Sequence, residues 1–234
     1  MMEASVANDS EFGEGLKAGI SIAVGYMPVA LTFGLLARTT GLTLYEAVLM
    51  SVLVFAGAAQ YITLSLVAIG TGAFEIIFTI FIVNIRHLLM SASINEKVEE
   101  DTPWKKAVYA FGITDETFTV SATKAGRLTT GYMFGLCLIS YSSWVLFTGG
   151  GYIAGATLPS VVQQGMSVAL YAMFIGLLIP SAKKSRKVLF LAALAALFNS
   201  FLTFAQFSTG WSIVLATLLS SIIVEWVMGG EKNE

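Results

Sequence analysis

Three polar side chains lie close together within the largely apolar segment 72–94. Asn84, Arg86 and His87, which is the only histidine of the chain, fall within four consecutive positions. Charged and titratable groups are costly in hydrocarbon and are tolerated mainly where they face a cavity, a partner or a substrate. Arginine can hold a carboxylate in a bidentate pair, and histidine titrates near neutral pH. The alternatives are structural: Arg86 could extend to the membrane surface, and His87 could be a hydrogen-bonded structural side chain.

A second group of polar residues follows at Thr114-Asp115-Glu116-Thr117. Neighbouring carboxylates on a helix do not face each other, so they do not form the paired acid and base of a glycosidase. Either Asp115 or Glu116 could instead pair with Arg86, meet an ammonium group or carry a proton. The structural alternative is an acidic turn that caps a helix N-terminus.

Other polar or helix-breaking residues fall near the middle of apolar segments. Pro28 removes a backbone hydrogen bond, so it predicts either a simple kink or a broken helix whose freed groups bind a ligand. Gly57 belongs to a run of small residues that ends at Gln60, whose amide could join helices or meet a polar substrate. Asn199 lies in a later segment and could complement Asn84.

The composition is that of a membrane protein. Of 234 residues, 56% are hydrophobic and 12% are charged, whereas soluble domains carry about 25% charged residues. The net charge of −2 argues against a nucleic-acid partner. One cysteine and one histidine leave no metal cluster, and no phosphate-binding glycine loop is present. We therefore expect no cofactor and no enzymatic activity.

Apolar stretches of about 20 residues predict an all-α integral membrane protein with about seven spans. The expected spans are 16–37, 44–69, 72–94, 130–151, 164–181, 187–206 and 209–228. Residues 95–129 are too polar for an ordinary span, and 104–122 predicts a re-entrant or interfacial helix. Residues 1–15 are expected to be a mobile acidic tail and 229–234 a polar tail, with a single transporter domain over 16–228 between them.

The basic residues predict the orientation. The loops 95–129 and 183–187 are rich in lysine and arginine, which favours the cytoplasmic side and puts the N-terminus outside and the C-terminus inside. The three-helix units 16–94 and 130–206 would then be oppositely oriented, as in transporters with inverted repeats. The segment 95–129 would link them, and 209–228 would be an extra helix.

Four segments together resemble the AzlC family of branched-chain amino-acid exporters, also known as azaleucine-resistance proteins. The resemblance covers nearly the whole chain and is most specific in the pairing of the third and fourth segments. The matching segments are Gly25-Tyr26-Met27-Pro28-Val29-Ala30, Phe55-Ala56-Gly57-Ala58-Ala59-Gln60, Asn84-Ile85-Arg86-His87-Leu88-Leu89-Met90 and Thr114-Asp115-Glu116-Thr117-Phe118.

The resemblance implies a multi-pass protein of the bacterial cytoplasmic membrane that exports valine, leucine and isoleucine, and sometimes methionine, with the proton gradient. It also implies a small second membrane subunit of the AzlD type. The substrate-binding candidates are Tyr26, Pro28, Gly57, Gln60, Asn84, Arg86 and Asn199, and the proton-coupling candidates are His87, Asp115 and Glu116. A channel-like pore for a small polar solute and a non-transporting membrane scaffold are the alternatives.

Overall fold

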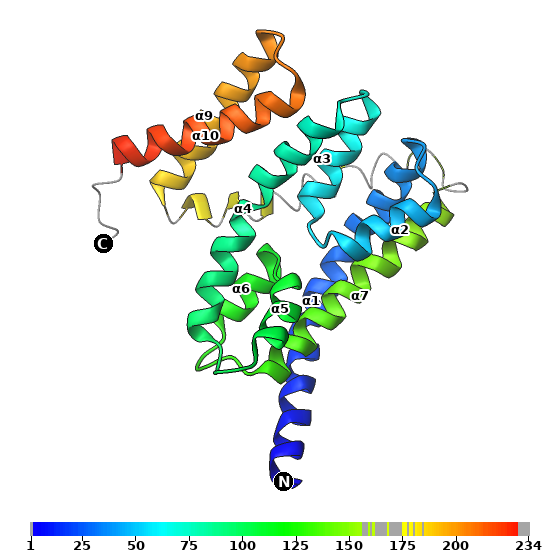
Figure 1. Ribbon diagram of the computed structural model, residues 1–234, viewed down its shortest axis with the longest axis vertical. Helices are drawn as coiled ribbons and strands as arrows, with labels where there is room; N and C mark the ends of the chain where they lie inside the picture. Colours follow the sequence, from blue (N-terminus) through cyan, green and yellow to red (C-terminus); the bar gives the residue numbers. More distant parts are fainter. Residues whose placement is uncertain are drawn as a thin grey trace. The chain divides into compact units, whose positions relative to one another are not determined.

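Helices make up the secondary structure of the part of the chain that the computed structural model describes (Figure 1). That part covers residues 2–155 and 185–228, with single residues and short pieces between them, and side chains from residue 11 on. The helices are α1 (Met2–Thr39), α2 (Leu44–Leu53), α3 (Gly57–Ala68), α4 (Ala73–Lys97), α5 (Pro103–Phe111), α6 (Asp115–Thr123), α7 (Thr130–Ala154), α9 (Arg186–Phe204) and α10 (Thr209–Met228).

Five of these helices are long and apolar enough to cross a membrane: α1 from Glu11 on, α4, α7, α9 and α10. They correspond to five of the predicted spans. The predicted span 164–181 falls largely outside the described residues, as does the tail 229–234. The remaining predicted span, 44–69, is not one helix.

The chain divides into two units, which we describe separately. The first contains Met1–Tyr61 and Asn84–Ala169, and the second contains Ile62–Val83 and Leu170–Glu234. In the second unit α9 and α10 pack against each other, and Lys187 near the start of α9 forms an ion pair of 2.6 Å with Glu225 near the end of α10. The two helices therefore form an antiparallel hairpin.

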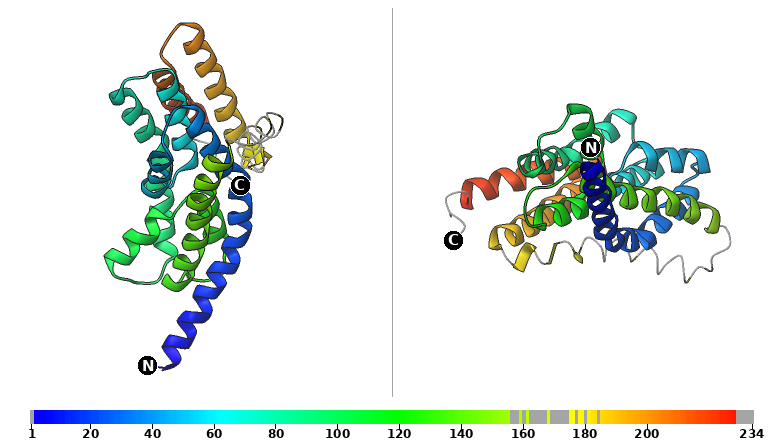
Figure 2. Two further views of the ribbon diagram at one scale, coloured as in Figure 1. Left: turned by 90° about the vertical axis from the view of Figure 1, so that its right-hand side faces the viewer. Right: turned by 90° about the horizontal axis from the view of Figure 1, so that it is seen from below.

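In the first unit, α1 and α7 lie side by side because glycines let their backbones touch (Figures 1 and 2). A Cβ atom on Gly15 would lie 2.1 Å from the carbonyl oxygen of Tyr132, and one on Gly34 would lie 2.0 Å from that of Thr148. Because the contacts advance in the same direction along α1 and α7, the two helices run parallel. The inverted repeat predicts the opposite direction for these two helices, so that prediction is wrong for this pair.

Helix α1 is continuous through Pro28 and begins at Met2. The broken helix considered for this proline is therefore not present, and the hydroxyl of Thr32 bonds the Pro28 carbonyl at 2.8 Å within the same helix. Residues 2–15, which we expected to form a separate acidic tail, are part of α1. A Cβ atom on Gly135 would lie 2.2 Å from the carbonyl oxygen of Phe12, so the last part of that segment packs on α7.

The apolar segment 44–69 folds as two short helices separated by non-helical residues 54–56. Val52 at the end of α2 accepts a hydrogen bond of 2.9 Å from Tyr141, while Tyr61 on α3 reaches back to the Val29 carbonyl at 2.8 Å. The chain therefore turns at Phe55, beside the middle of α1 and α7. Gly57 permits the turn, because a Cβ there would lie 2.8 Å from the ring of Trp144.

The polar segment 95–129 contains α5 and α6, each nine residues long. A helix of this length spans about 14 Å, which is too short to cross a bilayer. Thr102 is the N-cap of α5 and Pro103 occupies its first turn, as their types predict. Thr117 and Ser121 of α6 are fully buried, and α6 packs against α1 and α7.

Candidate functional site

The first turn of α6 presents two carboxylates to the interior of the first unit. Thr114 caps the helix. Its backbone N–H donates to the Thr117 hydroxyl at 2.7 Å, and the backbone N–H of Thr117 donates to the Thr114 hydroxyl at 3.3 Å. The positive end of the helix dipole favours the negative charges of Asp115 and Glu116. The capping alternative is therefore correct for Thr114, whereas the two carboxylates reach other helices.

Arg86 on α4 forms an ion pair with Asp115, with 2.9 Å between Nη1 and Oδ2. The side chains are 40% and 28% exposed, so the pair is partly open to its surroundings. The Nε atom of Arg86 is buried and has no hydrogen-bond partner among the described residues. Arginine carries five N–H donors. Arg86 therefore pairs with one carboxylate and keeps a buried donor unused.

Glu116 is held by Tyr26 from the middle of α1. The Tyr26 hydroxyl donates to Glu116 Oε2 at 2.6 Å and lies 2.7 Å from the hydroxyl of Thr114. Since Tyr26 donates to the carboxylate, Thr114 must donate to Tyr26. Tyr26 is 4% exposed, and the edges and faces of Phe55 and Trp144 enclose its ring at centroid distances of 6.0 and 5.1 Å.

Asn84 and His87 lie on α4 beside Arg86. The Oδ1 atom of Asn84 is buried and has no hydrogen-bond partner among the described residues. His87 is half-buried, and its Nδ1 lies 3.3 Å from the carbonyl oxygen of Asn84, one turn earlier on the same helix. Asn84 and Arg86 are two residues apart, so their side chains lie on different faces of α4, and the contact of His87 is local.

Gln60 is fully buried and its amide joins helices. Its Nε2 donates to the Ser51 hydroxyl at 3.1 Å, and its Oε1 accepts from Trp144 Nε1 at 2.7 Å. Ser51 in turn lies 2.9 Å from the hydroxyl of Thr148. Both polar ends of Gln60 are therefore engaged by α2 and α7, which is the structural alternative rather than an exposed substrate contact.

The other predicted site residues have different surroundings. Gly57 makes room for the Trp144 ring, and Pro28 is exposed on α1. Asn199 belongs to the second unit, where it is exposed on α9. The sequence reasoning missed Trp144. Its signal was a tryptophan near the centre of a predicted span, away from the membrane surfaces where this residue usually lies.

No three histidine, cysteine, aspartate or glutamate side chains come together as a metal site within the described part of the chain. The arrangement is instead that of an all-helical membrane protein with charged and titratable groups packed between its helices. The chain belongs to the AzlC family: the family model described as "AzlC protein" matches residues 21–158. This match includes every residue of the cluster around Tyr26, Arg86 and Asp115.

Related proteins from three organisms are also named as membrane or transport proteins. An uncharacterized membrane protein of Archaeoglobus fulgidus is 38% identical over 76% of this chain and 80% of its own length. The inner membrane protein YgaZ of Escherichia coli is 31% identical over 78% of each chain. The branched-chain amino acid transport protein AzlC of Bacillus subtilis is 25% identical over 72% of this chain and 66% of its own length. No solved structure matches.

Proposed function

We propose that the chain is the large subunit of a secondary transporter that exports valine, leucine and isoleucine, with methionine as a further substrate, across the bacterial cytoplasmic membrane. The observation that carries the proposal is the buried Nε donor of Arg86, which has no hydrogen-bond partner among the described residues although the same guanidinium group pairs with Asp115. A zwitterionic amino acid offers a carboxylate to this guanidinium group and an ammonium group to a carboxylate in the first turn of α6. The relative in Bacillus subtilis supports the substrate class.

The ion pair between Arg86 and Asp115 suggests how a proton would be coupled to the substrate. The substrate carboxylate and Asp115 compete for the same guanidinium group, which is 2.9 Å from Asp115 in this structure. When a proton binds to the Asp115 carboxylate, the pair loses its charge attraction, and Arg86 can turn to the substrate. When the substrate leaves, Asp115 releases the proton and pairs with Arg86 again.

Glu116 supplies the opposite charge for the substrate ammonium group. Tyr26 fixes one of its carboxylate oxygens at 2.6 Å, which leaves the other oxygen for a ligand. The turn at residues 54–56 between α2 and α3, which we call the α2–α3 hairpin, places the ring of Phe55 against the ring of Tyr26. A change in the position of this hairpin would move the ring that covers Tyr26, which gives alternating access a movable element next to the charges.

The proposed transporter works with a small AzlD-type membrane subunit and with lipid around it. Large apolar side chains such as Leu189, Leu197 and Phe201 are exposed on α9 in the second unit. In a bilayer these side chains face lipid tails or another membrane helix. The transport measurement should therefore be made with the small subunit present and absent.

The test is the uptake of labelled leucine, valine, isoleucine and methionine into everted vesicles that carry a proton gradient. Arg86→Ala should abolish the uptake, and Asp115→Asn should remove its dependence on the gradient. Arg38→Ala is the matched control, because Arg38 at the end of α1 contacts the carbonyl and ring of Tyr152 on α7 and, among the described residues, forms no ion pair with Asp115 or Glu116. Loss of uptake in the control as well, or no uptake by the wild type with the small subunit, would contradict the proposal.

A further inference from the structure

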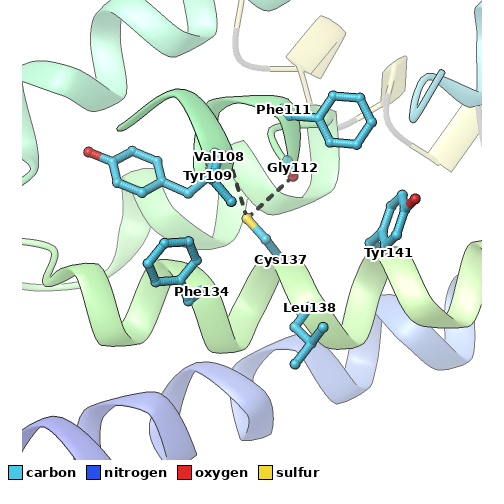
Figure 3. A pocket seen from close by; sticks show the side chains of 8 residues that line it. All are labelled: Val108, Tyr109, Phe111, Gly112, Phe134, Cys137, Leu138 and Tyr141. Atoms are coloured by element: carbon cyan, nitrogen blue, oxygen red, sulfur yellow. Dashed lines mark hydrogen bonds between the residues drawn. The ribbon is translucent and has the colours of Figure 1, made fainter. Parts of the chain in front are cut away.

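An apolar pocket of about 320 Å³ opens between α5 and α7 in the first unit (Figure 3). Val108 and Phe111 of α5 form one side, and Phe134, Leu138 and Tyr141 of α7 form the other. Ligand sites in proteins usually measure about 300 to 1,000 Å³, so this pocket suits a small ligand.

The pocket offers few polar groups to a ligand. The thiol of Cys137 lies 3.5 Å from the Gly112 carbonyl oxygen and 3.7 Å from that of Tyr109. The hydroxyl of Tyr109 is directed away from these side chains in Figure 3. A group that fills the pocket is therefore a short hydrocarbon rather than a polar or charged one.

Two connections join the pocket to the charged site, by which we mean Arg86, Asp115 and Glu116. Gly112 precedes Asp115 by three residues, so the Cα atoms of the two are at most about 10 Å apart. The ring of Tyr141 also contacts Phe55 at a centroid distance of 5.4 Å, and Phe55 contacts the ring of Tyr26, which bonds Glu116. One wall of the pocket therefore continues into the shell around the two carboxylates.

We infer that this pocket holds the aliphatic side chain of the transported amino acid and sets the preference for branched side chains over smaller ones. The inference rests on the proposed function, which assigns the amino and carboxyl groups to the charged site. Each methylene group in an apolar pocket changes the discrimination between substrates by about 10 to 200-fold. Substitutions of the residues that line the pocket should therefore change the ratio of leucine to alanine transport more than they change the rate of alanine transport.

The first test changes the size of the pocket. Leu138→Trp fills it and should lower leucine transport relative to alanine transport by at least ~10-fold, with a raised KM for leucine. Phe111→Ala enlarges it and should shift the preference in the other direction. Leu146→Trp is the matched control, because Leu146 lies on the same helix and is 72% exposed but lines a different groove, between α1 and α7.

The second test uses the single cysteine as a reporter. Cys137 lines the pocket and is 7% exposed, so we expect a small apolar maleimide to alkylate its thiol only by entering the pocket. Leucine should slow alkylation of Cys137 several-fold in membranes, alanine should slow it much less, and Cys137→Ala should give no labelling. Protection that follows the lipid environment and not leucine would assign the pocket to a lipid chain and overturn the inference.

The outcomes separate the inference from the function it rests on. Suppose the wild type transports leucine, but Leu138→Trp and Leu146→Trp have the same ratio of leucine to alanine transport. The pocket is then not the site of the substrate side chain, while the proposed transport function stands. If the wild type transports no amino acid, the proposed function fails and the inference fails with it. A change of ratio in Leu138→Trp together with protection of Cys137 by leucine supports both.

Discussion

The hydroxyl of Tyr26 joins α1 to the first turn of α6 and has both a donor and an acceptor role there. We expect Tyr26→Phe to lower transport by about 10- to 100-fold, because a hydrogen bond to a charged group contributes about 1.5 to 3 kcal/mol. The measurement is the initial rate of leucine uptake, corrected for the amount of protein in the membrane.

The control for Tyr26→Phe is Tyr152→Phe. Tyr152 is also on a long helix, and its hydroxyl donates to the Leu42 carbonyl at 2.8 Å, away from the carboxylates. This control should keep nearly full transport. If both variants lose transport equally, the hydroxyl of Tyr26 has no special place in the site.

The candidate site could be predicted in part from residue types. The cost of charge in hydrocarbon singled out Arg86 and Asp115, and the structure pairs them. The same argument singled out Gln60, but the partners that satisfy its amide, Ser51 and Trp144, lie 9 and 84 residues away. Residue type shows that a buried polar group needs a partner, and only the fold shows whether that partner is protein or substrate.

At the scale of the helix, the contact between α1 and α7 depends on individual glycines. A Cβ atom on Gly151 would lie 2.0 Å from the Leu31 carbonyl oxygen, so Gly151→Ala forces the backbones apart. We expect it to destabilise the protein by about 1 to 3 kcal/mol, the usual cost of overpacking. Thermal unfolding of the purified protein in detergent measures this as a lower Tm.

Gly13→Ala is the matched control for this packing argument. Gly13 also lies in a helix, but a Cβ atom there would have nothing within 4 Å. Alanine has a higher helix propensity than glycine, so this variant should leave Tm unchanged or raise it slightly. Equal losses of Tm in both variants would show that helix propensity, and not the contact between α1 and α7, decides the effect.

Hydropathy predicted the long helices well and failed at the segment 44–69. A single membrane span and two short apolar helices joined by a turn have the same average hydropathy, because both bury the segment in an apolar environment. The distinguishing feature is Gly57, where the ring of Trp144 occupies the space of a side chain. That ring comes from a helix much later in the chain, so the local sequence could not indicate the turn.

The connection between α4 and α5 carries a pH-sensitive contact outside the membrane-spanning helices. Asp101 accepts hydrogen bonds from the Thr130 hydroxyl and the Thr102 N–H, and Lys105 lies 3.0 Å away. The hydrogen bond from Thr130 is the main cause that lowers the pKa of Asp101 from 3.8 to about 2. Because the pKa of Asp101 is lower in the folded than in the unfolded protein, its carboxylate stabilises the fold at pH values above the unfolded-state pKa. This stabilisation is lost as the pH falls towards the folded-state pKa.

We therefore expect the Tm advantage of the wild type over Asp101→Asn to be constant above about pH 4 and to shrink between about pH 4 and pH 2. Thr130→Val removes the main hydrogen bond and should bring the pKa of Asp101 back towards 3.8. In the Thr130→Val background, the loss of Tm caused by Asp101→Asn should then be smaller than in the wild type at every pH above 4. An advantage of the wild type that does not change with pH would contradict this account.

At the scale of the first unit, the parallel course of α1 and α7 puts the basic segment 95–129 beside the N-terminal part of α1, whereas Arg38 alone of the basic residues of α1 lies in its last turn. Lys124 forms an ion pair of 3.3 Å with Glu14 near the start of α1, and the Leu128 N–H donates to the carbonyl of Lys97 at the end of α4. Residues 95–129 contain five lysines and arginines. We propose that this end is cytoplasmic by the positive-inside rule, which puts the N-terminus inside and not outside as the sequence suggested.

An inside N-terminus also agrees with Lys17, a basic residue in the N-terminal half of α1. The test places one cysteine at each end of α1 in a Cys137→Ala background and uses a thiol reagent that cannot cross the membrane. Gly13 has open space around it and Thr39 is exposed, so either position should tolerate a cysteine. Thr39→Cys should be labelled in intact cells and Gly13→Cys only in everted vesicles. The reverse pattern would restore the outside N-terminus and place the lysines of 95–129 on the outer face.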